Sequence, residues 1–405
     1  MKVYQKIFAI IFMIALMGFS VCNMIFKFSD IKEAFLKIEK PESVSDAKKY
    51  TASIDNVFIE NLLFDHSWNE AYAKVYDFLG KNEENSFAYV RDKNNMLYAG
   101  NFWNLPNAST KDYINRMLEL KKQAEERGAK LVVLLYPCLY NEAWTDGYYG
   151  IPYTDYNQLG DEMTAYFRYY GIDFIDYRDV FIEQGKTAEE IFFRTDHHWT
   201  IQTAFDAFVE LTNHLNEEYE ENLDMYYTDK SNYEYVTYEN IYIGSQGRDA
   251  GVNYVGADDF TYILPKFKSS YSCKFTYSSD KIENRQGSMQ DVLINTRVAE
   301  KEDYYDREMY AAYMDGVRMH DYIVNNNNPE GLNVLFIRDS FSSPLATFFS
   351  SYCNTMDMYW SVQNDAATME QAVENGEYDY IFVGLAIDSY ANYGFEIYKE
   401  AGTNE

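Results

Sequence analysis

Positive charge is scarce in this chain of 405 residues. It has 35 lysines and arginines against 64 aspartates and glutamates, which gives a formal net charge of −29. Because such a charge repels phosphate groups, the composition argues against a nucleic-acid binder and against a polybasic contact with anionic lipid. Tyrosine and phenylalanine are abundant instead, and we attribute them to core packing before sugar stacking.

Cysteine is also scarce. The four cysteines are scattered through the chain without a C-x-x-C pair, namely Cys22, Cys138, Cys273 and Cys353. This pattern excludes a disulfide framework and a thiolate zinc site, and it predicts free, mostly buried thiols. The sequence gives no sign of a bound cofactor or of a resident metal.

One long apolar run stands at the N-terminus. From Ile7 to Phe26 only Ser20 and Asn23 are polar, and at helical rise the run spans roughly 30 Å, enough to cross a bilayer. No A-x-A-like cleavage site follows, so we expect an uncleaved anchor rather than a signal peptide. Lysines flank both ends and do not set the orientation. A short stub before a single anchor usually stays inside, which predicts a single-pass cell-membrane protein with an extracytoplasmic body.

The rest of the chain divides by composition and periodicity. We expect a membrane anchor over 1–29, a polar stalk over 30–50 and one α/β domain over 51–400. Residues 225–325 are rich in tyrosine, asparagine and serine. Strand-like alternation at 233–244 and 271–278 predicts a β-rich insertion there, which would partly line the site.

Strands and helices alternate from about residue 110 onward. Apolar runs predict buried strands, and helical spacing of apolar residues between them predicts helices. The expected strands are 130–137, 173–177, 333–337 and 380–386, and the expected helices are 110–127, 156–170, one from 201, 344–353 and 369–376. This alternation predicts a doubly wound, mainly parallel sheet with helices on both faces.

Two of the five histidines stand together in the stretch R-T-D-H-H-W-T, residues 194–200. If the stretch is extended, Asp196 and His198 project to one side and His197 to the other. A carboxylate that orients an imidazole suits an acid–base catalyst. The alternative is structural: Asp196 caps the following helix while the histidines pack.

A nucleophile is available in the stretch F-I-R-D-S-F-S-S-P-L, residues 336–345. It follows a predicted buried strand, and Ser343 and Pro344 suit the N-cap and first position of a helix. Ser340 would then lie in a strand-to-helix turn at a carboxyl edge of the sheet, where backbone N–H groups and the helix dipole can hold an oxyanion. Ser340, His198 and Asp196 would form an acyl-transfer triad, if the fold brings together residues about 140 positions apart.

The stretches RTDHHWT and FIRDSF together resemble the DHHW protein family. That family is similar to SGNH-like extracellular proteins that O-acetylate bacterial polysaccharides, such as the alginate O-acetyltransferases, and more distantly to the teichoic-acid alanylation protein DltD. The resemblance implies an SGNH-like sheet with Ser340 as nucleophile, His198 as base and Asp196 as its orienting carboxylate. His197 would be a spacer, although an exchange of roles between the two histidines stays open.

The resemblance also implies a function. It is that of a membrane-anchored, extracytoplasmic O-acyl (acetyl) transferase or esterase acting on a cell-surface polysaccharide. A membrane-bound O-acyltransferase would be the partner that supplies acetyl groups.

One departure from the family pattern concerns Arg338, which stands where related proteins have the glycine of Gly-Asp-Ser. Its side chain is expected to crowd the oxyanion pocket or to attract an anionic substrate. Weaker candidates for contact with substrate or oxyanion are Ser245 and Arg248, in the stretch G-S-Q-G-R. Tyr136 is another, at the expected mouth of the site.

Two other functions stay open. A non-catalytic protein for surface-polymer assembly or glycan binding could keep the scaffold while Arg338 spoils the pocket. A metal-dependent phosphoesterase is the second, because Asp-His-His is also a metal-binding string; it would need further carboxylates, and only Asp173, Asp176 and Asp179 are near.

Overall fold

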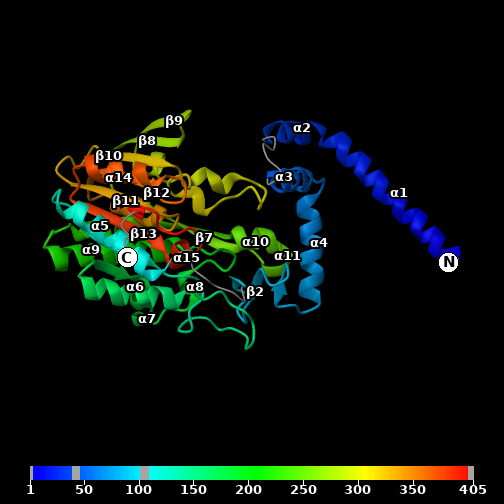
Figure 1. Cartoon of the computed structure of the whole chain (residues 1–405), viewed down its shortest axis with the longest axis horizontal. Coiled ribbons are helices and arrows are strands. Elements are labelled where there is room, and N and C mark those ends of the chain that lie inside the picture. The colour runs from blue at the N-terminus through cyan, green and yellow to red at the C-terminus, as the bar shows by residue number, and fades with distance from the viewer. Residues whose placement is uncertain (1–2, 39–45, 101–108, 400–405) are drawn as a thin grey trace. The chain divides into compact units, whose positions relative to one another are not determined.

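The computed structural model describes residues 3–38, 46–100 and 109–399, and the chain forms two compact units, Met1–Phe78 and Leu79–Glu405. The first unit contains the helices α1 (Val3–Phe26), α2 (Phe28–Lys37), α3 (Asp46–Glu60) and α4 (Asp65–Phe78) (Figure 1). The segment expected as a stalk is therefore partly helical, and its residues 39–45 lie outside the described residues. The predicted boundaries at 29 and 50 stay predictions.

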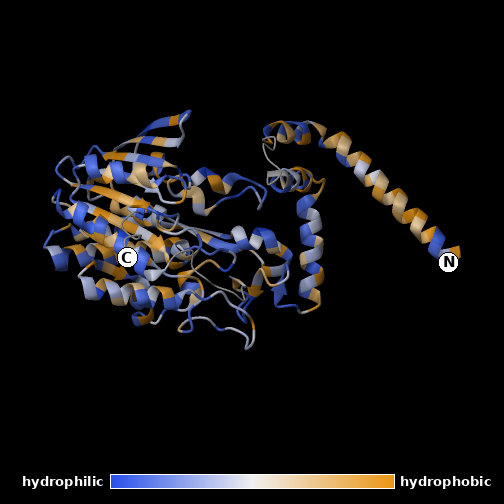
Figure 2. Cartoon of the chain, in the orientation of Figure 1, coloured by the Kyte–Doolittle hydropathy of each residue, from blue (hydrophilic) through white to orange (hydrophobic). Residues whose placement is uncertain are grey.

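Helix α1 is long and apolar enough to cross a membrane, and it is coloured as hydrophobic along most of its length (Figure 2). Its side chains are mostly exposed. Asn23 is an exception, because its amide oxygen accepts a hydrogen bond of 2.7 Å from the backbone N–H of Leu63.

The second unit is built on an eight-stranded sheet with the order β5-β4-β13-β11-β12-β10-β8-β9. The first five strands pair in parallel, and β10, β8 and β9 continue the sheet in antiparallel fashion. The predicted mainly parallel sheet is confirmed. In sheet order the strands are β5 (Asp173–Asp176), β4 (Lys130–Tyr136), β13 (Tyr380–Ala386), β11 (Leu332–Arg338), β12 (Cys353–Trp360), β10 (His320–Asn325), β8 (Tyr271–Ser278) and β9 (Lys281–Gly287).

Helices cover both faces of this sheet, as predicted. Successive strand residues point to opposite faces, so Val132 and Leu134 belong to one hydrophobic cluster and Leu131 and Val133 to the other. On the first face lie α7 (Tyr177–Glu183), α8 (Ala188–Ile191), α9 (Ile201–Tyr219) and α13 (Ser342–Phe349). On the second face lie α5 (Thr110–Glu125), α6 (Asn157–Tyr170), α14 (Ala366–Asn375) and α15 (Ile387–Asn392).

Helix ends follow local chemistry. Thr200 caps α9 as expected, and its hydroxyl accepts a hydrogen bond from the backbone N–H of Thr203. Helix α6 ends at Gly171, which has a left-handed φ of 63°. Helix α13 begins at Ser342, not at residue 344, and it ends earlier than expected, because the chain turns into β12, a strand that the sequence did not predict.

The β-rich segment is only partly a separate insertion. Strand β6 (Tyr233–Tyr242) pairs with β7 (Asp258–Pro265) in a two-stranded sheet, with α10 (Ser245–Ala250) and α11 (Val252–Val255) between them. Strands β8, β9 and β10 instead extend the main sheet, because β10 pairs with β12 along its length. The remaining short elements are β1 (Glu83–Glu84), β2 (Tyr89–Arg91), β3 (Leu97–Ala99) and α12 (Met289–Val292).

Candidate active site

Ser340 lies in the turn between β11 and α13, two residues before the helix begins. Its Oγ is 2.6 Å from Nε2 of His198, and Nδ1 of the same imidazole is 3.0 Å from Oδ2 of Asp196. The fold therefore brings a hydroxyl, an imidazole and a carboxylate into one hydrogen-bonded row, across 142 positions of sequence. The His198 side chain is 12% exposed and that of Asp196 only 2%, so the row is largely shielded from water.

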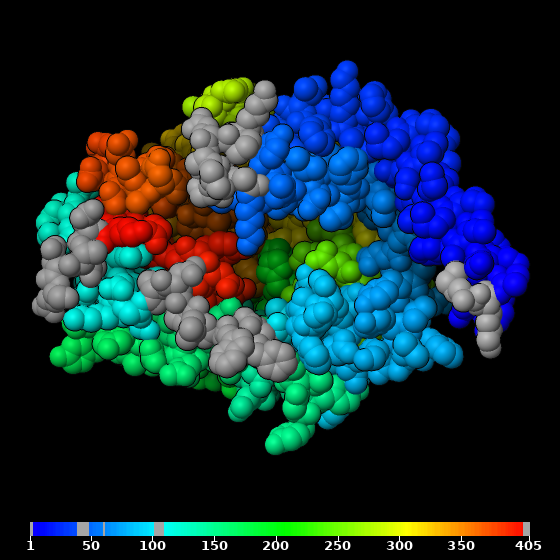
Figure 3. All heavy atoms as spheres, turned by 45° about the vertical axis from the view of Figure 1, so that its right-hand side comes forward, coloured from blue at the N-terminus to red at the C-terminus, as the bar shows by residue number. Residues whose placement is uncertain are grey.

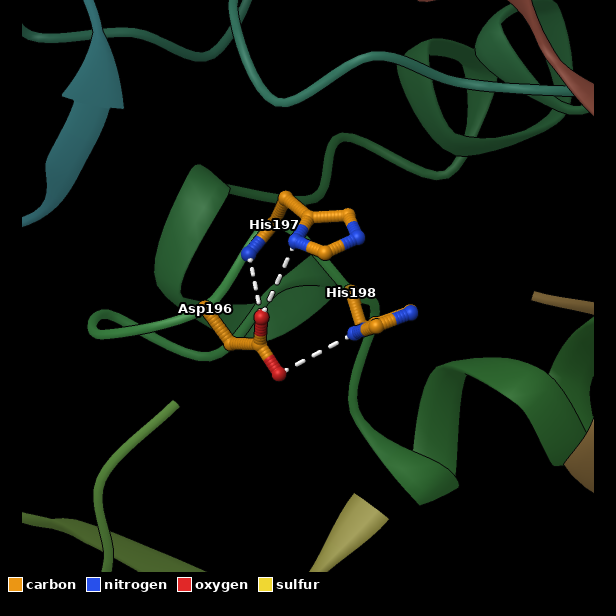
Figure 4. Close-up of side chains that lie close together, drawn as sticks. All are labelled: Asp196, His197 and His198. Atoms are coloured by element: carbon orange, nitrogen blue, oxygen red, sulfur yellow. Dashed lines mark hydrogen bonds and ion pairs between the residues drawn. The ribbon is translucent and has the colours of Figure 1, made fainter. Parts of the chain in front are cut away.

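The two histidines contact different oxygens of the Asp196 carboxylate (Figure 4). His198 binds Oδ2, while the backbone N–H of His197 donates to Oδ1 at 2.9 Å and its Nδ1 lies 3.1 Å from the same oxygen. The expectation of an extended stretch with His197 on the opposite side is therefore wrong, because residues 194–198 form a turn and bend that wrap around the carboxylate. Of the two imidazoles, His198 is the one that reaches Ser340.

Two hydroxyl groups from the β-rich segment complete the surroundings of Asp196. The hydroxyl of Tyr242, at the end of β6, donates to Oδ2, and that of Ser245, at the start of α10, donates to Oδ1 at 3.0 Å. Ser245, predicted to contact substrate or oxyanion, therefore supports the carboxylate instead. Tyr242 is not among the predicted site residues, and its only signal in the sequence is its place in an aromatic strand just before the G-S-Q-G-R stretch.

Aromatic packing fixes the position of His198. The ring of Tyr310 stacks on the imidazole with centroids 3.9 Å apart and planes 16° apart. Trp199 is fully buried and donates from its indole N–H to the carbonyl of Phe341 at 3.2 Å. The motif tryptophan thus ties the histidine segment to the turn that carries Ser340. No pattern in the sequence pointed to Tyr310.

Burial and neighbouring charges set the protonation states. Burial alone would raise the pKa of Asp196, but the His198 and His197 imidazoles and their hydrogen bonds hold it well below its usual value. Burial and the nearby His197 lower the pKa of His198 to about 4, although Asp196 acts in the opposite direction. At neutral pH His198 is therefore an uncharged imidazole, the form that can accept a proton from a hydroxyl.

Asp339 shapes the turn rather than facing the row. Its Oδ1 accepts from the backbone N–H of Phe341 at 3.0 Å, and its Oδ2 accepts from the N–H of Ala386 and the hydroxyl of Ser389 at 2.7 and 2.8 Å. These bonds attach the Ser340 turn to the end of β13. Burial raises the pKa of Asp339 to about 6 despite these donors.

Arg338 does not lie where it was expected. The side chain has no exposed surface, and Nη2 is 2.7 Å from Oδ2 of Asp321, a buried residue that also pairs with Arg318. Nη1 donates to the hydroxyl of Ser343 at 3.3 Å. The expectation that Arg338 crowds the oxyanion pocket or attracts substrate is corrected, because an arginine paired inside the core does not face a ligand.

Two further candidates have hydrogen-bond or ion-pair partners within the protein. Tyr136 is fully buried and its hydroxyl is 2.8 Å from that of Ser342, so it does not line the mouth of the site. Nη2 of Arg248, on α10, is 2.7 Å from Oε1 of Glu308. Neither contact supports the predicted role in binding substrate or oxyanion.

Among the residues that the structure describes, Asp196, His197 and His198 form a group that could hold a metal ion, since one ligand atom from each lies within 4.8 Å of the others. The further carboxylates that a phosphoesterase centre needs are engaged elsewhere. Asp176 is 2.7 Å from Arg178 in a buried ion pair, Asp173 lies 2.9 Å from His214, and Asp179 lies 3.7 Å from Arg168. Since Nε2 of His198 also faces Ser340, this donor set does not fit a phosphoesterase metal centre.

Residues 97–234 match the family model described as "SGNH hydrolase-like domain, acetyltransferase AlgX". The matched range includes Asp196 and His198, and Ser340 lies beyond it. No curated protein matches the chain.

Solved structures share the fold. PatB1 of Bacillus cereus with a sulfonyl adduct is 16% identical with a TM-score of 0.59, and the alignment covers 76% of this chain and 97% of that one. A second structure of Bacillus cereus PatB1 is 17% identical, with a TM-score of 0.56, and the alignment covers 76% of this chain and 98% of that one. A DHHW family protein from Eubacterium siraeum is 15% identical, with a TM-score of 0.54 and coverage of 76% and 95%.

The family model and the shared fold agree with the resemblance carried by the two motifs. Residues 97–234 are therefore similar to the SGNH hydrolase-like domain that the family model describes, and the chain shares its fold with PatB1 and with a DHHW family protein.

Proposed function

We propose that this protein is a membrane-anchored, extracytoplasmic O-acyl (acetyl) transferase or esterase that acts on a cell-surface polysaccharide through Ser340, His198 and Asp196. The observation that carries the proposal is the row of contacts from Ser340 Oγ through His198 to Asp196, with separations of 2.6 and 3.0 Å. A nucleophile within hydrogen-bond reach of a base, itself oriented by a third group, is the signature of covalent acyl transfer.

The first half-reaction forms an acetyl-enzyme. Ser340 Oγ attacks the carbonyl carbon of an acetyl ester, and its proton passes to Nε2 of His198. Asp196, ionised because its pKa is depressed, stabilises the resulting imidazolium through Nδ1. The tetrahedral intermediate collapses, its bond to the donor's alcohol oxygen breaks, and that oxygen takes the proton from His198. The start of α13 lies just beyond Ser340, where its dipole favours the developing oxyanion.

The second half-reaction decides between transferase and esterase. A glycan hydroxyl attacks the acetyl carbonyl, gives its proton to His198 and leaves as the acetylated sugar, while Ser340 recovers the proton. If water attacks instead, acetate is released. A membrane-bound O-acyltransferase would supply the acetyl group, and α1 would place this protein at the same membrane.

A non-catalytic scaffold is the weaker alternative. Its motivation was that Arg338 would spoil the pocket, and the burial of Arg338 against Asp321 removes that motivation.

The decisive experiment uses the full chain in detergent with a chromogenic acetyl ester, together with labelling by a sulfonyl fluoride. Wild type should hydrolyse the ester and form one sulfonyl adduct at Ser340, and Ser340→Ala should do neither. Ser279→Ala, an exposed serine in the β8–β9 turn, is the matched control and should behave as wild type.

Three outcomes would refute parts of the proposal. Equal rates for wild type and Ser340→Ala would rule out the serine mechanism. Loss of activity with a chelator, restored by manganese, would favour the metal reading. Resistance of the second unit to protease added outside intact cells, with cleavage after lysis, would contradict the extracytoplasmic placement.

A further inference from the structure

A pocket of about 250 Å³ lies beside the candidate catalytic row. Two of its lining residues, His197 and Phe341, adjoin His198 and Ser340 in sequence, and the His197 and His198 rings are 3.9 Å apart. The space-filling view shows a hollow between the red C-terminal residues and the yellow-green residues near 245–255 (Figure 3). Asp388 and Asn392 of α15 and Gln246 of α10 come from these two segments and line the pocket.

The tyrosines of the lining, Tyr98, Tyr140 and Tyr156, make up what we call the tyrosine wall of the pocket. Tyr98 and Tyr140 line it, and both rings pack against Tyr153, with centroid separations of 5.3 Å in each case. Tyr156 lines the pocket too, and its hydroxyl donates to Oδ1 of Asn392 at 3.0 Å, which fixes the orientation of that amide. Rigid aromatic faces beside oriented amide and carboxylate groups suit a ligand with apolar C–H faces and hydroxyl edges.

Among the described residues, the lining contains one acidic side chain, Asp388, and one imidazole, His197. Burial raises the pKa of Asp388, and the nearby His197 imidazole opposes that shift. Burial lowers the pKa of His197, but Asp196 and Asp388 together raise it above its usual value. No lysine or arginine is among the lining residues that the structure describes. Recognition of a carboxylate or phosphate normally uses such side chains, and the net charge of −29 also disfavours a polyanion.

We propose that this pocket binds one uncharged pyranose ring of the acceptor glycan, with Asp388 accepting hydrogen bonds from ring hydroxyls and the tyrosine wall contacting the ring face. The volume lies below the roughly 300 Å³ at which drug-sized sites begin, which suits a single ring rather than a longer segment. The inference rests on the proposed function and specifies its substrate class: a neutral hexose or N-acetylhexosamine polymer rather than a polyuronate or a phosphate-linked polymer.

The test measures sugar binding in Ser340→Ala, which cannot turn the ligand over. Saturation-transfer NMR against the full chain in detergent would compare methyl glycosides and short oligosaccharides of neutral hexoses and N-acetylhexosamines with those of uronic acids and sugar phosphates. We expect at least one neutral ring to bind at millimolar concentration or below, and we expect Asp388→Ala to raise its dissociation constant about tenfold, the effect of one lost charged hydrogen bond. Glu377→Gln, which removes an exposed carboxylate outside the pocket, is the control and should leave binding unchanged.

The inference is overturned if the ionised sugars bind and the neutral ones do not, if no neutral ring of the panel binds, or if a neutral ring binds equally well to Asp388→Ala. Failure of the proposed function is separate, because it shows as equal ester hydrolysis by wild type and Ser340→Ala, whatever sugars bind.

Discussion

Replacing Asp196 by asparagine gives the sharpest test of how the catalytic row works. The carboxylate accepts hydrogen bonds on both oxygens, and Oδ2 receives both the Nδ1–H of His198 and the hydroxyl of Tyr242. An amide nitrogen in that position donates instead. The imidazole then carries its proton on Nε2, which faces Ser340 at 2.6 Å and can no longer accept the serine proton.

The expected loss follows from this change of tautomer. In serine triads an aspartate-to-asparagine change of this kind lowers kcat by about 10⁴, and each factor of ten is about 1.4 kcal/mol of activation free energy. We therefore expect Asp196→Asn to lower kcat by 10³ to 10⁴, about 4 to 5.5 kcal/mol, with a smaller change in KM. The assay is hydrolysis of a chromogenic acetyl ester at pH 7 with the full chain in detergent.

Folding must be checked separately, because Asp196 is buried and its replacement disturbs several donors. Thermal unfolding of Asp196→Asn should show a cooperative transition, and Asp280→Asn, an exposed aspartate in the β8–β9 turn, should match wild type in rate and melting temperature. A folded Asp196→Asn variant that retains more than a tenth of the wild-type kcat would refute the assigned role of this carboxylate.

Four further outcomes follow from the structure. As pH falls, kcat/KM should stay level to about pH 5 and decline with a midpoint near 4, because the pKa of His198 is lowered to about 4 and only the neutral form accepts a proton; a midpoint at 6.5 or above would contradict this. Because the pKa of a histidine in the unfolded chain is near 6.5, His198 binds more protons in the unfolded state than in the folded state between pH 6.5 and 4. The contribution of His198 to the free energy of unfolding should therefore fall as the pH drops through that window, and urea unfolding measures this. Arg338→Met should destabilise the fold by about 3 to 5 kcal/mol, since it removes one of the two arginines that neutralise buried Asp321, and a loss below 1 kcal/mol in urea unfolding would contradict the buried pair. Gly244→Ala should lower the rate of ester hydrolysis about 100-fold, because a Cβ there would lie 2.6 Å from Cγ of Asp196 and displace that carboxylate. An unchanged rate would contradict this, because it would mean that the backbone moves to accommodate the methyl group without displacing Asp196.

Much of the parallel core was predictable because its signals are local. The apolar runs that became β4, β11 and β13 can be buried only in the middle of a sheet, and Thr200 and Gly171 mark helix ends through their own chemistry. Strand β12 was not predicted, because its polar and apolar residues alternate next to a helix, where periodicity alone does not define the boundary between helix and strand.

The site was predictable in part for a different reason. Asp196, His198 and Ser340 stand in short motifs that a resemblance can carry. Tyr242 and Tyr310 contact Asp196 and His198 only through long-range folding, and tyrosine is too common in this chain for either to stand out. The buried position of Arg338 likewise depends on Asp321, a partner 17 positions away on another strand.

The dependence of Asp196 on Tyr242 and Ser245 has a consequence for how shorter relatives are judged. A relative that lacks the counterpart of residues 233–265 would still contain both motifs, with the catalytic aspartate, histidine and serine present. It would nevertheless have lost the two hydroxyls that donate to Asp196, so the carboxylate that orients the imidazole would be less firmly held. Competence in such proteins is therefore better judged by whether some other segment replaces those two donors than by the motif letters alone.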